Sequence, residues 1–133
     1  MEMNKLLPHL IRLKGQANLT VEGTSMEPYL FAGDVVTVEA DDDYITGDIL
    51  VFYYKEEKLL IHRLLDEVSG RYFCKGDNAL RVEDVTGDQI VGKVTLVNGV
   101  PPESWFYWKI DLSRRVGKEF HRCRYDSAAS KES

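Results

Sequence analysis

The sequence has few cysteines and no long apolar run. Only two cysteines, Cys74 and Cys123, occur in the 133 residues, and their separation does not match the close pairs that bind zinc. We therefore expect free thiols and neither a metal nor another cofactor. The best apolar run spans residues 49–54, far short of the roughly 20 residues that a membrane-spanning helix needs.

An excess of positive charge is also absent. Lys and Arg number 17 against 22 Asp and Glu, which gives a formal net charge of −5 at pH 7. This balance argues against a nucleic-acid-binding protein with a basic face. Residues 1–13 include Glu2 and an apolar stretch broken by Pro8, a poor match to a secretory signal. We therefore expect a cytoplasmic protein that binds no nucleic acid and meets a membrane only peripherally, if at all.

Leucines at helical spacing predict a short N-terminal helix. Leu7, Leu10 and Leu13 would lie on one face, and Gly15 follows as a stop signal. Proline lacks the N–H that a helix interior needs, so we expect Pro8 in the first turn of this helix.

From residue 18 the hydrophobic period changes to two, which is typical of β-strands. Six short segments fit strands, at residues 19–21, 35–38, 49–54, 59–65, 72–74 and 90–97. Glycines punctuate the sequence between them. Short strands at this spacing predict a mainly β domain, an antiparallel barrel or sandwich.

A second amphipathic helix is predicted after Pro101 and Pro102. Its apolar positions recur every three or four residues, at 105, 108, 112, 116 and 120. We divide the chain into residues 1–104, a β domain with its N-terminal helix, residues 105–126, the C-terminal helix, and residues 127–133, a disordered tail.

The C-terminal helix has two interpretations. Residues 105–124 carry six Lys and Arg against two Asp and Glu, a net charge of +4, which leaves the rest of the chain at −9 against a total of −5. The segment begins with four aromatic residues, which favour a membrane interface. It is therefore either an interfacial anchor or a helix that covers an open end of the barrel with its basic side in water.

Three clusters carry residue types suited to catalysis. Ser25 lies between two predicted strands, where a turn can present its hydroxyl, although serines in turns commonly cap the backbone instead. His62 shares a strand face with Leu60 and Leu64, so it is either a buried histidine bonded to a backbone group or a general base. Lys-Gly-Asp-Asn at residues 75–78 is either a plain turn or a segment that brings a carboxylate beside that base.

These clusters belong to five blocks in a recognisable order. They read Gly-x-Ser-Met-x-Pro-x-Leu-x-x-Gly-Asp from residue 23, Gly-Asp-Ile-Leu-Val-Phe from 47, His-Arg from 62, Lys-Gly-Asp-Asn from 75 and Ile-Val-Gly-Lys-Val from 90. The series resembles the signal peptidase I family, which shares a superfamily with self-cleaving repressor peptidases. The resemblance covers residues 19–97 and implies a coiled antiparallel β barrel with short N-terminal and C-terminal helices.

The resemblance also implies roles for individual residues. Ser25 matches the nucleophile, and its backbone N–H would meet the oxyanion. His62 stands where most bacterial members carry a lysine base, as in the branch of endoplasmic-reticulum, archaeal and some sporulation-type peptidases that uses histidine. In that branch an aspartate assists. Asp77 and Asp84 are the matching candidates, with Glu83 ranked behind them.

We therefore expect a serine endopeptidase that cleaves a leader or precursor peptide, taken from a peptide or preprotein substrate. A strand edge beside the serine would hold that substrate extended, and the resemblance implies small residues before the cut. Two alternatives stay open. One is an inactive peptide-binding module of the same fold, and the other is a self-cleaving repressor-type domain. The second lacks support because the 24 residues before Ser25 contain neither an Ala-Gly nor a Cys-Gly dipeptide.

Overall fold

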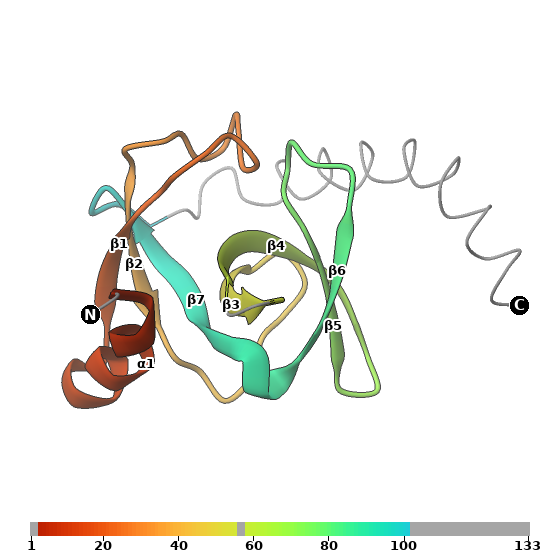
Figure 1. Cartoon of the computed structure of the whole chain (residues 1–133), viewed down its shortest axis with the longest axis horizontal. Coiled ribbons are helices and arrows are strands. Elements are labelled where there is room, and N and C mark those ends of the chain that lie inside the picture. Colours follow the sequence, from red (N-terminus) through yellow and green to blue (C-terminus); the bar gives the residue numbers. More distant parts are fainter. Residues whose placement is uncertain (1–2, 56–57, 102–133) are drawn as a thin grey trace, which may run out of the picture.

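The computed structural model describes residues 3–55 and 58–101 (Figure 1). One helix opens this part of the chain, and seven strands follow. Their bounds are α1 Met3–Lys14, β1 Ala17–Thr20, β2 Val35–Glu39, β3 Ile49–Tyr54, β4 Lys58–Val68, β5 Arg71–Lys75, β6 Val82–Thr86, the short 3₁₀ turn η1 Gly87–Gln89, and β7 Ile90–Val97. The strands form one antiparallel sheet in the order β1-β2-β7-β3-β4-β5-β6, curled into a half-barrel.

The mainly β architecture predicted from the sequence is confirmed. Each of the six predicted segments forms a strand, with bounds that differ by a few residues. β6, Val82–Thr86, is a strand that the hydrophobic pattern did not predict. The helix predicted over residues 105–126 and the tail predicted over 127–133 lie outside the described residues.

The structure corrects the expected place of Pro8 in the N-terminal helix. Pro8 is the sixth residue of α1 rather than part of its first turn. A proline there removes one hydrogen bond of the helix. Leu7 and Ile11, one turn apart, are 2% and 4% exposed in the core, and this burial stabilises the helix despite the proline. Leu13 is exposed, and Gly15, with a φ of 80°, ends the helix in the left-handed conformation.

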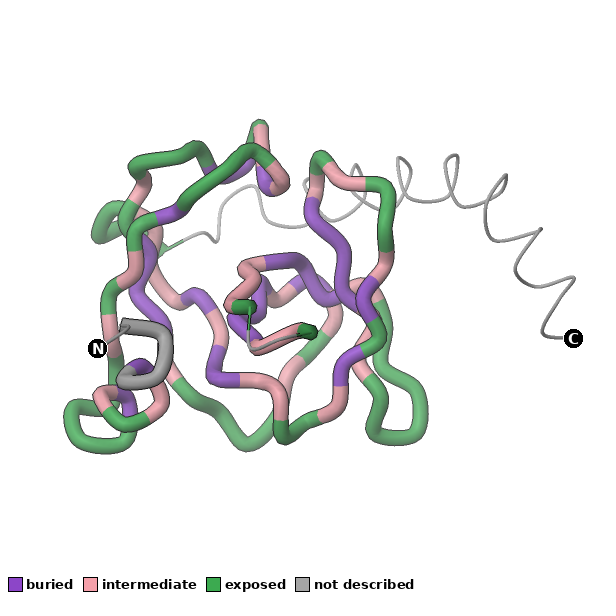
Figure 2. Tube along the Cα trace, in the orientation of Figure 1, coloured by how far each residue is buried: buried purple, intermediate pink, exposed green. Residues whose placement is uncertain are grey.

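β3 runs through the middle of the fold and separates two apolar clusters. Ile49 and Val51 pack into the larger cluster, with residues of α1, β1, β2 and β7. Leu50 and Phe52 point to the other face and pack into a smaller cluster with residues of β4, β5 and β6. All four side chains are buried (Figure 2). Because successive side chains of a strand alternate between faces, β3 joins the two halves of the molecule through one continuous apolar strand.

Besides the outer edge of β6, the last strand in the order, two strand edges stay open in the described part of the sheet. β1 is a terminal strand, so one of its edges has no neighbour. β4 pairs with β3 from Lys58 onward but with β5 only from Arg63 onward. Residues 58–62 of β4 therefore have β3 on one side and no described strand on the other.

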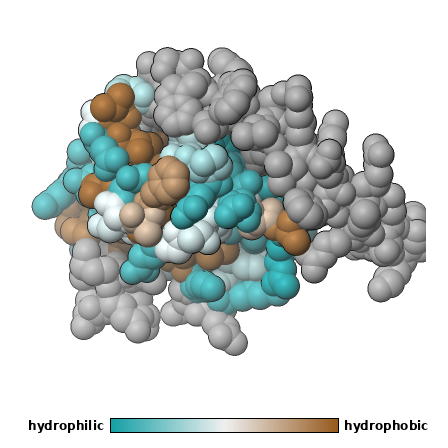
Figure 3. Space-filling model, turned by 90° about the horizontal axis from the view of Figure 1, so that it is seen from above, coloured by the Kyte–Doolittle hydropathy of each residue, from teal (hydrophilic) through white to brown (hydrophobic). Residues whose placement is uncertain are grey.

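The surface of the described residues carries no large continuous apolar face in the view from above. Hydrophilic residues cover most of it, and apolar residues occur in separate small groups (Figure 3). The exposed large apolar side chains are Leu13, Phe31, Val35, Ile45, Val68, Leu80 and Val100. No helix in residues 3–55 and 58–101 has the length and apolar character to cross a membrane.

Candidate active site

Ser25 lies in the loop between β1 and β2, and backbone hydrogen bonds tie the two ends of this loop together. Val21 N–H donates to Asp34 O at 2.8 Å, and Gly33 N–H donates to Val21 O at 2.9 Å. Within the loop, Met26 is 2% exposed and anchors the segment in the larger apolar cluster. The serine hydroxyl is therefore presented on a turn whose next residue is fixed in the core.

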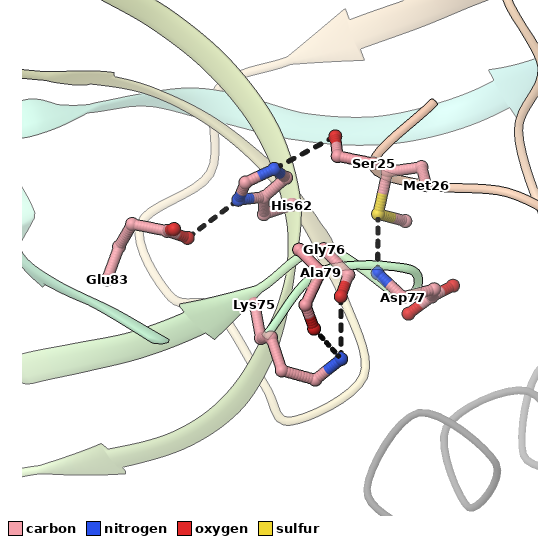
Figure 4. A network of polar contacts seen from close by, with 8 residues as sticks. All are labelled: Ser25, Met26, His62, Lys75, Gly76, Asp77, Ala79 and Glu83. Carbon is pink, nitrogen blue, oxygen red and sulfur yellow. Dashed lines mark hydrogen bonds and ion pairs between the residues drawn. The ribbon is translucent and has the colours of Figure 1, made fainter. Parts of the chain in front are cut away.

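His62, on β4, lies beside the serine. Its Nε2 is 3.1 Å from Ser25 Oγ (Figure 4). The imidazole meets the Phe52 ring edge to face, with ring centroids 6.1 Å apart. Leu60 and Leu64 pack into the same smaller cluster as Phe52, as strand alternation predicted. The imidazole is thus held between an apolar surface and the serine hydroxyl.

Glu83 contacts the other nitrogen of the imidazole. Nδ1 of His62 lies 2.6 Å from Oε1 of Glu83, and the two side chains are only 7% and 5% exposed. A carboxylate oxygen accepts hydrogen bonds, so this contact assigns the ring proton to Nδ1. The lone pair on Nε2 then faces the hydroxyl of Ser25. The three side chains form one hydrogen-bonded series from the serine to the glutamate (Figure 4).

Neither aspartate favoured by the sequence contacts the imidazole. Asp77 accepts two hydrogen bonds from the Arg63 guanidinium, each 2.8 Å long, in a buried ion pair. Asp84 pairs with Arg71 at the surface, where the two side chains are 47% and 51% exposed. The structure therefore puts Glu83, the third candidate, in the place where we expected an aspartate.

The turn that follows β5, at residues 76–79, presses against Ser25. A Cβ added at Gly76 would lie 2.5 Å from Ser25 O and 3.1 Å from His62 Nε2, so only glycine permits this approach. Asn78 N–H donates to Ser25 O at 2.8 Å, and the Asn78 side chain donates to Thr24 O at 3.1 Å. The Gly-Asp-Asn block thus holds Ser25 and does not supply the carboxylate that contacts the imidazole.

Two cations and two carboxylates are buried in this part of the fold. Arg63 and Lys75 are 0% exposed, and the side chains of Asp77 and Glu83 are 6% and 5% exposed. The formal charges of these four groups cancel. Burial lowers the pKa of Lys75, while the charges of Asp77 and Glu83 act to raise it. Burial and then the charge of Glu83 raise the pKa of Cys74, so this residue stays a thiol.

A cleft of about 960 Å³ opens beside the serine and the histidine. One wall consists of residues 18–26, from β1 and the serine loop, and the other includes residues 58–62 of β4. Tyr54, Lys55, Asn78, Arg81 and Glu83 complete the lining. Both walls are therefore built from the open strand edges described above. Within the described ranges, no group of three or more His, Cys, Asp or Glu side chains is arranged to hold a metal ion.

A family model described as Peptidase S24-like matches residues 5–95, more than half of the chain. The chain belongs to the Peptidase S24-like family. The match includes the serine, the histidine and the glutamate of the hydrogen-bonded series. No curated protein matches the chain. Membership gives this S24-like domain a serine peptidase or self-cleaving repressor-type fold, in agreement with the curled antiparallel sheet.

Within the S24-like domain, Glu83 is the site residue that sequence reasoning underrated. Along β6, Glu83 and Val85 are buried whereas Asp84 is exposed. The signal was present in the sequence, because a strand through Val85 places Glu83 on the same face and Asp84 on the opposite one. The hydrophobic pattern does not predict a strand at residues 82–86, so it does not assign Glu83 and Asp84 to opposite faces.

Proposed function

We propose that this S24-like domain is a serine endopeptidase in which His62 is the general base for Ser25 and Glu83 orients the imidazole. The observation that carries the proposal is the hydrogen-bonded series of these three side chains, with separations of 3.1 and 2.6 Å. Both separations lie in the range over which a positioned base takes a proton. The series opens onto the cleft, so a peptide carbonyl can approach the serine.

The reaction divides into two steps that balance. The Ser25 hydroxyl gives its proton to Nε2 of His62 as the oxygen attacks a peptide carbonyl, and the backbone N–H of Ser25 would meet the oxyanion. The C–N bond breaks, and the amine leaves with the proton from the imidazolium. Water then gives a proton to the same nitrogen and attacks the ester. The ester C–O bond breaks, the imidazolium returns this proton to the Ser25 oxygen, and the carboxylic acid product leaves. Glu83 stabilises the imidazolium in both steps.

The open edge of β4 supports an extended peptide substrate. Leu64 N–H donates to Asp48 O on the β3 side, so the even-numbered residues of this part of β4 direct their backbone groups toward β3. Alternation along the strand then directs the N–H and C=O groups of Leu59 and Ile61 toward the cleft. These groups are available to pair with a substrate backbone, as in peptide recognition by strand addition.

The opposite wall offers the same kind of edge. Val21 exchanges hydrogen bonds with Gly33 and Asp34, so its backbone groups face away from the cleft. Alternation therefore turns the backbone groups of Thr20 and Glu22 toward the open side of β1. A substrate strand lying between the two walls would find backbone partners on both sides. This arrangement supports an unfolded leader or precursor segment over a folded protein surface as the substrate.

The walls near the serine also bear on which residues precede the cut. Leu19, Leu59 and Ile61 are partly buried and pack against the larger apolar cluster. Their exposed parts line the cleft and leave an apolar lining close to Ser25. This lining supports a small apolar side chain before the scissile bond, the preference that the signal peptidase resemblance implies.

A fluorophosphonate probe tests the proposal, because it reacts with serines that a neighbouring base activates. We expect the purified chain to take up one probe at Ser25, identified by the mass of the labelled peptide. Ser25→Ala should take up none, and His62→Ala should react at least about 100-fold more slowly. Ser69→Ala, which changes a turn serine after β4, is the matched control and should react like the wild type.

The same experiment separates the alternatives. A wild-type chain that stays unlabelled but binds extended peptides would be an inactive binding module. Fragmentation of the chain at a rate independent of its concentration would indicate a self-cleaving repressor-type domain instead.

A further inference from the structure

Lys75 is a buried lysine that the proposed chemistry does not use. It is the last residue of β5 and is 0% exposed. Its ammonium donates to Gly76 O at 2.6 Å and to Ala79 O at 3.1 Å (Figure 4). Among the described residues it forms no ion pair with a carboxylate. Burial of an ammonium costs free energy of folding when only neutral carbonyl groups accept its hydrogen bonds. These hydrogen bonds therefore point to a role of Lys75 other than stabilising the fold.

The two carbonyl groups that accept from Lys75 belong to the first and last residues of the 76–79 turn. Ala79 N–H also donates to Gly76 O at 3.0 Å, which closes this turn. Between these residues, Asn78 N–H donates to Ser25 O at 2.8 Å. The ammonium therefore holds both ends of the segment whose middle contacts the nucleophile.

Other contacts also tie the middle of this turn to the rest of the site, and one of them is the bond from the Asn78 side chain to Thr24 O. Asp77 N–H contacts Met26 Sδ at 3.4 Å, and the Asp77 carboxylate pairs with Arg63 on β4. Those contacts act on the middle of the turn, whereas Lys75 acts on its ends. Without the ammonium, Ala79 O would lose this hydrogen bond and the turn could open toward the solvent.

We propose that Lys75 is a positioning residue: its ammonium holds the 76–79 turn closed, and the closed turn keeps Ser25 within hydrogen-bond distance of His62. The catalytic consequence rests on the proposed peptidase function. The effect on the turn is a property of the fold and can be measured without any activity.

The ammonium also balances charge among the buried groups of the site. Asp77 from the turn, Glu83 from β6 and Arg63 from β4 are the charged groups that act on it. Replacement of Lys75 by a neutral residue leaves one net negative charge among these buried groups.

Amide hydrogen exchange tests the turn directly in Lys75→Met, which keeps a long unbranched side chain. We expect the Asn78 amide to exchange at least about 10-fold faster than in the wild type, because its hydrogen bond to Ser25 O opens more often. The Leu64 amide, which donates to Asp48 O on the β3 side, should not change. Lys93→Met, which removes a lysine from a surface ion pair with Asp41, is the control variant and should leave Asn78 protected.

Probe labelling of Ser25 supplies the second measurement. We expect Lys75→Met to react at least about 10-fold more slowly, while its melting temperature stays near that of the wild type. If Lys75→Met does not fold, Lys75→Gln replaces it in both measurements, because its shorter side chain carries an uncharged amide NH2 group in place of the ammonium.

The outcomes are distinct. Unchanged exchange at Asn78 in a folded variant overturns the inference, whatever the activity. Faster exchange with an unchanged labelling rate overturns the link from the turn to the nucleophile. A wild type that the probe does not label contradicts the proposed function, and the exchange of Asn78 alone then decides the role of Lys75.

Discussion

Glu83→Gln tests how the imidazole is oriented with the least structural disturbance. Glutamine has the length of glutamate, so residue 83 can keep its buried position at 4% exposure. Its amide can donate to Nδ1 of His62, which would stabilise the tautomer that carries the proton on Nε2. That tautomer cannot accept the proton of Ser25. We expect kcat to fall about 10²–10⁴-fold with little change in substrate binding, the scale on which a wrong tautomer slows serine hydrolases.

The two aspartates supply controls that the geometry predicts to behave differently. Asp77→Asn removes the anionic partner of a buried guanidinium and should cost about 3–5 kcal/mol of unfolding free energy. For a domain of this size that corresponds to a fall in melting temperature of more than about 10 °C. Asp84→Asn removes only the half-exposed pair with Arg71 and should change neither stability nor rate appreciably.

Thermal unfolding and probe labelling, measured on the same preparations, complete the test. The expected pattern is a rate defect at unchanged melting temperature for Glu83→Gln, a stability defect for Asp77→Asn and neither for Asp84→Asn. A Glu83→Gln enzyme that keeps more than about a tenth of the wild-type rate would refute the role given to the glutamate. The same holds if Asp84→Asn lowers the rate alone, since Asp84 contacts only Arg71 at the surface.

Gly76, Lys75 and the C-terminal segment each allow a further prediction. Gly76→Ala should abolish labelling, since a Cβ would lie 2.5 Å from a backbone oxygen of the nucleophile, whereas Gly87→Ala, whose Cβ would meet its nearest atom at 3.9 Å, should react normally. Burial lowers the pKa of Lys75 below its usual 10.5, so in the window between its folded and unfolded values the unfolded chain binds more protons. The stability of the wild type relative to Lys75→Met, followed by calorimetry, should therefore rise as the pH approaches 10.5 and fall as the pH is lowered through the folded value. If residues 105–124 anchor the protein to a membrane, the full chain should sediment with anionic vesicles, less so at high salt, and truncation after Pro102 should end binding without unfolding the domain.

Most of the fold could be predicted from the sequence because the strands that form the core alternate or are uniformly apolar. β3, with four consecutive buried residues, and β7 are bounded by glycines or charged residues and leave little choice of structure. β6 could not be identified this way. Its sequence Val-Glu-Asp-Val-Thr buries a carboxylate where the pattern calls for an apolar side chain. The hydrophobic pattern therefore fails at the strand that buries a charged residue beside the imidazole.

The serine and the histidine could be proposed from sequence, but the carboxylate required the sheet. β6 lies two strands from β4, with β5 between them. Adjacent strands are about 4.8 Å apart, so a side chain on β6 that meets the imidazole must reach past the end of β5. A glutamate has one methylene more than an aspartate for this reach, and it must also point inward. The alternation of residues 82–86 indicates which side chain faces inward once they are known to form a strand, but the reach to the imidazole depends on the order of the strands in the sheet.

The Gly-Asp-Asn block shows why a motif residue need not act on the reacting atoms. Gly76 allows the turn to touch Ser25, Asp77 ties the turn to the strand that carries His62, and Asn78 holds the carbonyl of the nucleophile. The nucleophile and the base belong to separate segments of the sheet, and the loop of Ser25 alone does not set the distance between them. The turn at residues 76–79 lies against both Ser25 and His62, and it sets the distance between them. Displacement of this turn by about 1 Å would separate the serine from the imidazole while the strands remain paired, so the precision of the site depends on the turn more than on the sheet.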